Sequence, residues 1–102
     1  MRAGSLIPQT APNTIADGLL TSLGGLTWPI IREHVEHIFT VSEQQIVDAM
    51  RLLWERAKLL VEPSSAVVLA AVLTDEFREL EGINHVGLVL SGGNVNLSRL
   101  PF

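Results

Sequence analysis

The 102-residue sequence contains no cysteine, so it has no disulfide and no metal site built on thiolates. Basic residues are also few: there are seven lysines and arginines against eleven acidic residues, giving a formal net charge of -4. Because the basic residues are scattered, the sequence offers no positive patch for nucleic acid or an anionic membrane surface. The three histidines, His34, His37 and His85, show no spacing typical of a metal site.

Long hydrophobic runs are missing as well. No apolar run approaches the roughly 18 residues of a membrane span, and no apolar signal segment follows Met1 and Arg2. We therefore expect a soluble, cytoplasmic protein. Hydrophobic residues nevertheless make up 47% of the chain, which is more apolar surface than so short a chain can bury alone. The composition favours one modest unit that other structure must cover.

The spacing of hydrophobic residues predicts three main helices. The first runs from Thr27 to about Glu36, with Thr27 as its cap and a proline in its first turn. The second begins with a capping box at residues 42–45 and continues to about Leu60. The third follows Pro63 and contains eight successive apolar residues, 66–73, before Asp75 turns the segment polar. A helix that is apolar all round must be covered on several sides.

Two segments rich in β-branched residues, His37–Val41 and Val86–Leu90, predict strands. Residues 14–18 predict a tight loop, and residues 18–25 either line a pocket or connect two elements. Alternating helices and strands indicate an α/β layer with parallel strands. Two or three short strands cannot cover all the helices, so the chain is expected to need strands from elsewhere.

A glycine-rich segment, Ser91–Asn94, directly follows the second predicted strand. Paired glycines permit positive φ and a close approach of backbone to a ligand, and ligands of open α/β sheets bind beyond the carboxyl ends of strands. This arrangement predicts a binding loop in which Ser91 faces the ligand. The simpler alternative is an ordinary turn.

Five motifs in order along the chain resemble the C-terminal portion of the serine racemase and serine/threonine dehydratase family: residues 14–18, 26–31, 39–43, 54–63 and 90–95. These enzymes use pyridoxal phosphate and have the tryptophan synthase β-like fold (fold type II). The resemblance implies that residues 1–102 are the C-terminal part of one catalytic domain. It also implies a partial three-layer α/β/α architecture, with parallel strands and flanking helices.

The resemblance implies roles for individual residues. Ser91 matches the serine that hydrogen-bonds the pyridine nitrogen of the cofactor, and Gly18 matches a glycine whose backbone passes close to the cofactor ring. Glu62 matches a glutamate near the ring, although an acidic residue at a helix start is also an ordinary cap. Thr21 matches a serine that acts as acid or base on one face of the substrate. A threonine there keeps the hydroxyl and favours dehydration over racemisation.

Lys58 and Asn94 match positions that contact ATP at the subunit interface of the animal enzymes; the alternative for Lys58 is a solvated helix residue. Lys58 is the only lysine, and its surroundings do not match the family's cofactor-binding lysine motif. That lysine, the phosphate-binding loop and the divalent metal ligands belong to the N-terminal part of the family's chain. This chain alone is therefore expected to be an inactive fragment.

The implied activity belongs to the complete enzyme, which is expected to be a homodimer with Mg²⁺ and ATP as effectors. It removes the α-proton of L-serine or L-threonine and expels the β-hydroxyl, yielding a 2-oxo acid and ammonia. Reprotonation on the opposite face instead gives the D-amino acid. A different hypothesis is a stand-alone, non-catalytic α/β module that binds a nucleotide or a partner through its sheet edge and residues 91–94.

Overall fold

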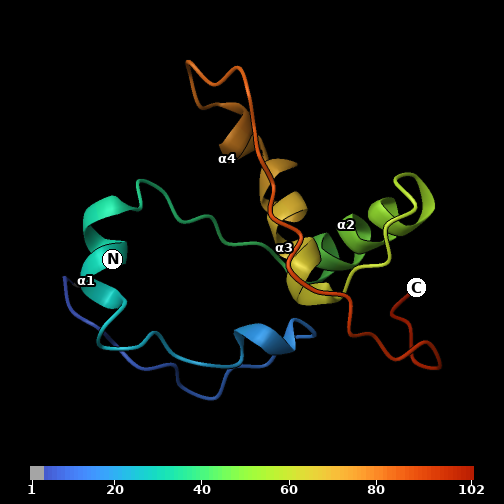
Figure 1. The fold of residues 1–102 in the computed structure, drawn as a ribbon, viewed down its shortest axis with the longest axis horizontal. Coiled ribbons are helices and arrows are strands. Elements are labelled where there is room, and N and C mark those ends of the chain that lie inside the picture. The colour runs from blue at the N-terminus through green and yellow to red at the C-terminus, as the bar shows by residue number, and fades with distance from the viewer. Residues whose placement is uncertain (1–3) are drawn as a thin grey trace.

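The structure, a computed structural model, describes residues 4–102. These residues form a short 3₁₀ helix and four α-helices, and no strand forms among them (Figure 1). The elements are η1 (Asp17–Leu19), α1 (Trp28–His34), α2 (Glu43–Glu55), α3 (Pro63–Val72) and α4 (Asp75–Arg78). The predicted helices are therefore present, and the predicted strands are not.

The start of α2 confirms the predicted capping box. The hydroxyl of Ser42 accepts the Gln45 N–H at 3.2 Å, and the Gln45 side-chain oxygen accepts the Ser42 N–H at 2.7 Å. This reciprocal pair satisfies donors that a helix start would otherwise leave unpaired. The apolar stripe of α2 is buried as its spacing predicted: Ile46, Ala49, Met50 and Leu53.

The end of α2 comes five residues earlier than expected. Lys58 adopts the left-handed conformation, with φ of 59°, which an α-helix cannot continue through. The Leu59 N–H then reaches back to the Leu53 carbonyl at 3.0 Å and satisfies one terminal acceptor. Residues 56–60 therefore form a turn, where the sequence predicted a last helical turn.

Two other helix boundaries also differ from expectation. Thr27 does not cap α1 with its side chain, because its hydroxyl donates to the Gly24 carbonyl at 3.1 Å instead. The third predicted helix is divided in two at Thr74, whose hydroxyl accepts the Phe77 N–H at 3.2 Å and caps α4. A threonine favours such a new start because its hydroxyl serves as an N-cap.

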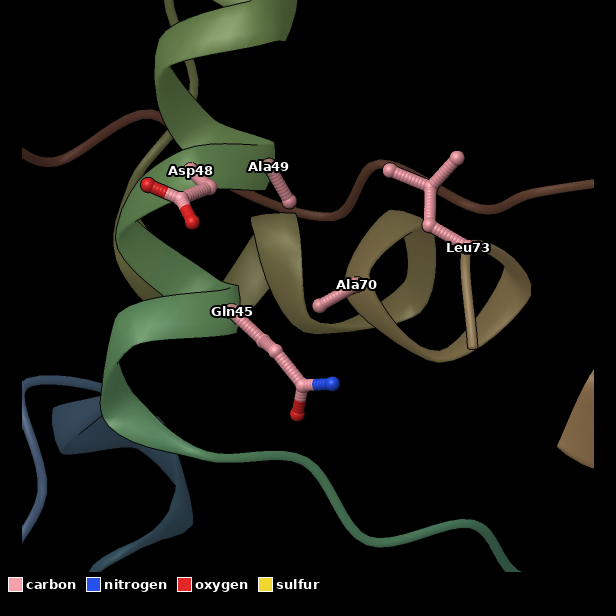
Figure 2. A pocket seen from close by; sticks show the side chains of 5 residues that line it. All are labelled: Gln45, Asp48, Ala49, Ala70 and Leu73. Carbon is pink, nitrogen blue, oxygen red and sulfur yellow. The ribbon is translucent and has the colours of Figure 1, made fainter. Parts of the chain in front are cut away.

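The core lies between α2 and α3. It consists of Ala16, Ile46, Ala49, Met50, Leu53, Val61, Ala66 and Ala70. Figure 2 shows Ala49 of α2 and Ala70 of α3 on facing sides of a hollow of about 170 Å³ that Gln45, Asp48 and Leu73 also line. These small side chains allow the two helices to approach closely. Ala16 is fully buried, so the loop before η1 is part of the same core.

The predicted strands, residues 37–41 and 86–90, are wrong as strands in the described chain. Both run as irregular chain: the first joins α1 to α2, and the second passes alongside α3 (Figure 1). Several of their large side chains are exposed, including Ile38 at 58% and Val89 at 77%. A strand requires a neighbour for its backbone N–H and C=O groups. The described residues supply none, so the predicted α/β layering is not formed.

The described chain is open in shape. Its radius of gyration is 14.8 Å, whereas a compact domain of this length has a radius of about 13 Å. In Figure 1, α1 lies apart from the pair formed by α2 and α3, and α4 extends beyond α3. The prediction that this sequence carries more apolar surface than it can bury agrees with this shape and with its exposed leucines, isoleucines and valines.

Candidate functional site

The start of α3 holds the glycine loop that contains Ser91. The Asn94 N–H donates to the Glu62 carboxylate at 2.9 Å. The backbone N–H of Glu62 donates to the Gly92 carbonyl at 3.1 Å. Glu62 is the N-cap residue of α3, as its alternative role predicted, but its side chain makes no capping hydrogen bond to the helix. Its carboxylate instead binds a loop 32 residues further along the chain.

At both glycines of this loop, Gly92 and Gly93, the neighbouring atoms leave no room for a Cβ. A Cβ on Gly92 would lie 2.8 Å from the Glu62 carboxyl carbon, and a Cβ on Gly93 would lie 2.9 Å from the Leu60 carbonyl oxygen. Neither glycine lies in the left-handed region, so the positive φ that glycine permits is not used here. The backbone at these glycines does lie close to other atoms, but those atoms belong to Glu62 and Leu60 of the same chain and not to a ligand.

The second glycine position, Gly18, contacts the same helix start. Its N–H donates to the Ser64 hydroxyl at 2.9 Å, and that hydroxyl donates to the Asp17 carboxylate at 3.4 Å. A Cβ on Gly18 would lie 3.0 Å from the Ser64 oxygen. The last two residues of the predicted tight loop, Asp17 and Gly18, therefore belong to η1, which contacts α3.

Thr21 and Gly18 line one cavity of about 530 Å³. Its wall is mostly apolar and includes Ile7, Leu19, Leu23 and Ile38; the polar side chains that line it are Gln9, Thr21, Ser22 and Thr40. The Gln9 side-chain amide donates to the Thr21 carbonyl, and the Gln9 N–H donates to the Ser22 hydroxyl at 2.8 Å. Of the two open interpretations of residues 18–25, the structure supports the one in which they line a pocket.

Ser91 is exposed at the start of its loop. Glu62, Gly92 and Asn94 lie together, and Gly18 is connected to them through the two-residue step from Glu62 to Ser64. The structure thus gathers three predicted positions, Gly18, Glu62 and the loop of Ser91, around the start of α3.

Lys58 lies elsewhere. Its ammonium group donates to the Glu55 carbonyl at 2.6 Å, and it lines a cavity of about 270 Å³ with Trp54, Leu59 and Leu60. Asn94 lines a different cavity, of about 250 Å³. The two positions assigned to a nucleotide therefore do not share a cavity among those found here.

Sequence reasoning missed two residues, Ser64 and Glu43. The Ile15 N–H donates to the Glu43 carboxylate at 2.8 Å. This hydrogen bond, with a smaller contribution from the Thr14 hydroxyl, lowers the pKa of Glu43 below its ordinary value. An acidic residue and a serine in the first turn of a helix are ordinary, so no pattern distinguishes them as ligands of a distant loop.

No helix within residues 4–102 has the length and apolar character needed to cross a membrane. In the same part of the chain, no group of three or more histidine, aspartate or glutamate side chains is placed to hold a metal ion.

The start of α3 thus binds both a loop that lines a cavity and a glycine loop. Comparison with known proteins identifies the class: the chain belongs to the family of pyridoxal-phosphate dependent enzymes, whose family model matches residues 1–92. The members are enzymes, and relatives of this chain include racemases and dehydratases. The resemblance inferred from the five motifs is confirmed.

The relatives define its place in that family. Serine racemase of Dictyostelium discoideum is 54% identical over 89 residues, which are 87% of this chain and 28% of the relative. The β-hydroxyaspartate dehydratase of Paracoccus denitrificans is 46% identical over 101 residues, which are 99% of this chain and 31% of the relative. The solved structure of maize serine racemase is 45% identical and superposes with a TM-score of 0.92, covering 95% of this chain and 31% of that chain. The chain thus spans about a third of its relatives' length.

The residues present suit part of a pyridoxal phosphate site. The exposed Ser91 hydroxyl is a neutral hydrogen-bonding partner of the kind a pyridine nitrogen accepts, and Gly18 presents backbone without a side chain to the cavity. A covalent site requires a lysine amine. Lys58 lies in the turn after α2, on the Glu55 carbonyl, and the two glycine positions lie at the start of α3.

Proposed function

We propose that this chain forms the C-terminal part of the catalytic domain of a pyridoxal-phosphate-dependent L-serine or L-threonine dehydratase. The superposition on maize serine racemase carries the proposal, because 95% of the chain follows that enzyme with a TM-score of 0.92. This shared backbone course supports assigning the family's roles to the predicted positions. The dehydratase of Paracoccus denitrificans, which matches 99% of the chain, supports elimination as the reaction.

In this proposal, pyridoxal phosphate stabilises the negative charge left when the substrate loses its α-proton. Ser91 donates or accepts a hydrogen bond at the ring nitrogen. A neutral hydroxyl favours the unprotonated nitrogen, unlike a carboxylate, and this moderates the electron withdrawal by the ring. Elimination of the β-hydroxyl is then favoured over transamination. Gly18 leaves room for the ring, and Glu62 lies at the edge of the same site.

Thr21 is proposed to carry a proton to or from one face of the substrate α-carbon. Its hydroxyl has only a long contact, to the Ser22 carbonyl at 3.5 Å, and Thr21 lines the largest of the cavities described here. Transfer of a proton to that face yields the D-amino acid, so serine racemisation is the second candidate. The Dictyostelium discoideum relative, a serine racemase, favours it.

The segments without strand neighbours indicate which other parts of the protein this chain would contact. Residues 37–41 and 86–90, without strand neighbours here, are proposed to pair with strands of the remaining two-thirds of the domain. That part is also proposed to contribute the cofactor-binding lysine and the divalent metal ligands. A homodimer with a nucleotide between subunits is proposed from the resemblance at Lys58 and Asn94, which line separate cavities in the described chain.

The first test mixes the chain with pyridoxal phosphate and records its visible absorption before and after borohydride reduction, followed by peptide mapping. We expect no specific adduct from this chain alone. A stoichiometric adduct on Lys58 would show that the chain builds a complete cofactor site by itself. Cooperative unfolding of the isolated chain without any partner would favour the stand-alone module instead.

The second test is complementation with the part of the Dictyostelium discoideum racemase that precedes the matching region. The proposal expects release of a 2-oxo acid from L-serine or L-threonine, measured by coupled NADH oxidation, and it expects Ser91→Ala to reduce this release. Ser98→Ala is the matched control, because Ser98 is an exposed serine further along the same segment. Equal activities of the two variants would exclude the proposed role of Ser91.

A further inference from the structure

Side chains of the segment Glu62–Ser64 bind the backbone of both the Ser91 loop and the Gly18 loop. Glu62 accepts the Asn94 N–H at 2.9 Å through its carboxylate. Two residues later, Ser64 accepts the Gly18 N–H at 2.9 Å through its hydroxyl. The two donor residues, Gly18 and Asn94, are 76 positions apart in the chain. The first turn of α3 is therefore a direct bridge between the two loops.

The backbone of the segment Glu62–Ser64 is held rigidly by the helix that it begins. Pro63, between the two residues, has a restricted φ and begins α3. The helix that follows packs on α2 through buried alanines, and Ser65 and Ala66 are almost inaccessible. The backbone from which the Glu62 and Ser64 side chains extend cannot shift far without moving a packed helix.

The two loops also face one another across this segment. A cavity of about 250 Å³ is lined by Ile15 and Asp17 from one loop, by Asn94, Val95 and Asn96 from the other, and by Pro63 between them. The carboxylate of Glu62 fills the space beside Gly92 that a Cβ would need. The contacts are thus close on both sides of the bridge.

We infer that Ser64 and Glu62 are positioning residues that set the separation between the Gly18 loop and the Ser91 loop. Neither needs to touch substrate for this role. The catalytic consequence rests on the proposed function, in which both loops lie beside one cofactor ring. A ring held between them needs a fixed spacing, because sub-ångström placement of catalytic groups decides rate.

The spacing can be measured without any cofactor. Because the chain has no cysteine, two spin labels can be attached to one molecule through the double substitution Leu20→Cys and Leu97→Cys. These positions lie beyond the two loops and are 44% and 64% exposed. The distance distribution between the labels, from pulsed electron paramagnetic resonance, should be narrow. It should broaden at least twofold in Ser64→Ala and in Glu62→Ala. Ser64→Thr keeps the hydroxyl and Glu62→Gln keeps an acceptor oxygen, so these variants should restore the narrow distribution.

A second measurement needs no variant. In the unlabelled chain, the Gly18 and Asn94 amide protons should exchange with solvent at least tenfold more slowly than exposed loop amides such as Val86. Rapid exchange at both positions would overturn the inference, and so would a distribution that is already broad or alanine variants that leave it narrow. If both measurements support the Ser64 and Glu62 hydrogen bonds but the complementation assay releases no 2-oxo acid, the proposed function fails and the positioning role stands.

Discussion

Alanine substitutions at Gly92 and Gly93 should destabilise the chain for different reasons, because one meets a movable side chain and the other meets a backbone atom. Gly92→Ala places a Cβ 2.8 Å from the Glu62 carboxyl carbon, whereas Gly93→Ala places one 2.9 Å from the backbone oxygen of Leu60. A carboxylate at the end of a flexible side chain can move away, but a backbone carbonyl cannot. The two substitutions should therefore differ in cost and in what relieves them.

The magnitudes follow from the contacts. Moving the carboxylate gives up its hydrogen bond from Asn94, worth about 1.5–3 kcal/mol for a charged acceptor and less for a half-exposed one. Alanine returns about 0.4–1 kcal/mol by restricting the unfolded chain. Gly92→Ala should therefore cost about 1 kcal/mol net. Gly93→Ala meets an immovable atom and should cost about 1–3 kcal/mol, the range for overpacking.

The assay is urea unfolding followed by far-UV circular dichroism, with each glycine variant made in two backgrounds. In Glu62→Ala the carboxylate is absent, so adding Gly92→Ala should be neutral or stabilising, while adding Gly93→Ala should cost as much as before. The reasoning is refuted if Gly92→Ala costs the same in both backgrounds. The obstacle would then not be the Glu62 side chain.

Three further predictions concern α2 and the loop that it holds. Met50→Ala removes a fully buried side chain and should lower the free energy of unfolding by about 2–5 kcal/mol, measured by urea titration against the exposed control Gln44→Ala. Ser42→Ala removes the capping box and should cost about 1 kcal/mol in the same titration; no loss would mean that the cap does not form in solution. The pKa of Glu43 is lowered in the folded chain, so its contribution to stability is present above its unfolded pKa and lost as pH falls through the folded one. Stability should rise between about pH 3 and 5 and rise less in Glu43→Gln, and an unchanged slope would contradict the Ile15 hydrogen bond.

Local signals in the sequence determined the helices. The Ser42 and Gln45 pair, the apolar stripe of α2 and the proline at the start of α3 act over three or four residues, within the reach of a helical turn. The five motifs likewise determined the family, because their order along the chain is a property of sequence alone. The position of Ser91 after an apolar segment was sufficient to direct attention to that loop.

Boundaries set by competing local bonds were less predictable. The end of α2 depends on Lys58 adopting positive φ, which is uncommon for a lysine. The division between α3 and α4 depends on the hydroxyl of Thr74 forming a new cap. The predicted strands required partners that the described residues do not contain, and β-branched composition cannot supply a missing neighbour.

Only the tertiary structure decided what surrounds the glycines and which side chains hold them. Glu62 and Asn94 are 32 positions apart, and Gly18 and Ser64 are 46 apart, so no periodicity connects them. The sequence predicted that the backbone at Gly92 and Gly93 approaches a ligand closely. The packing of α3 decided that the approaching groups are a carboxylate and a carbonyl of the same chain, because contacts between distant segments arise only when the helices between them are placed in space.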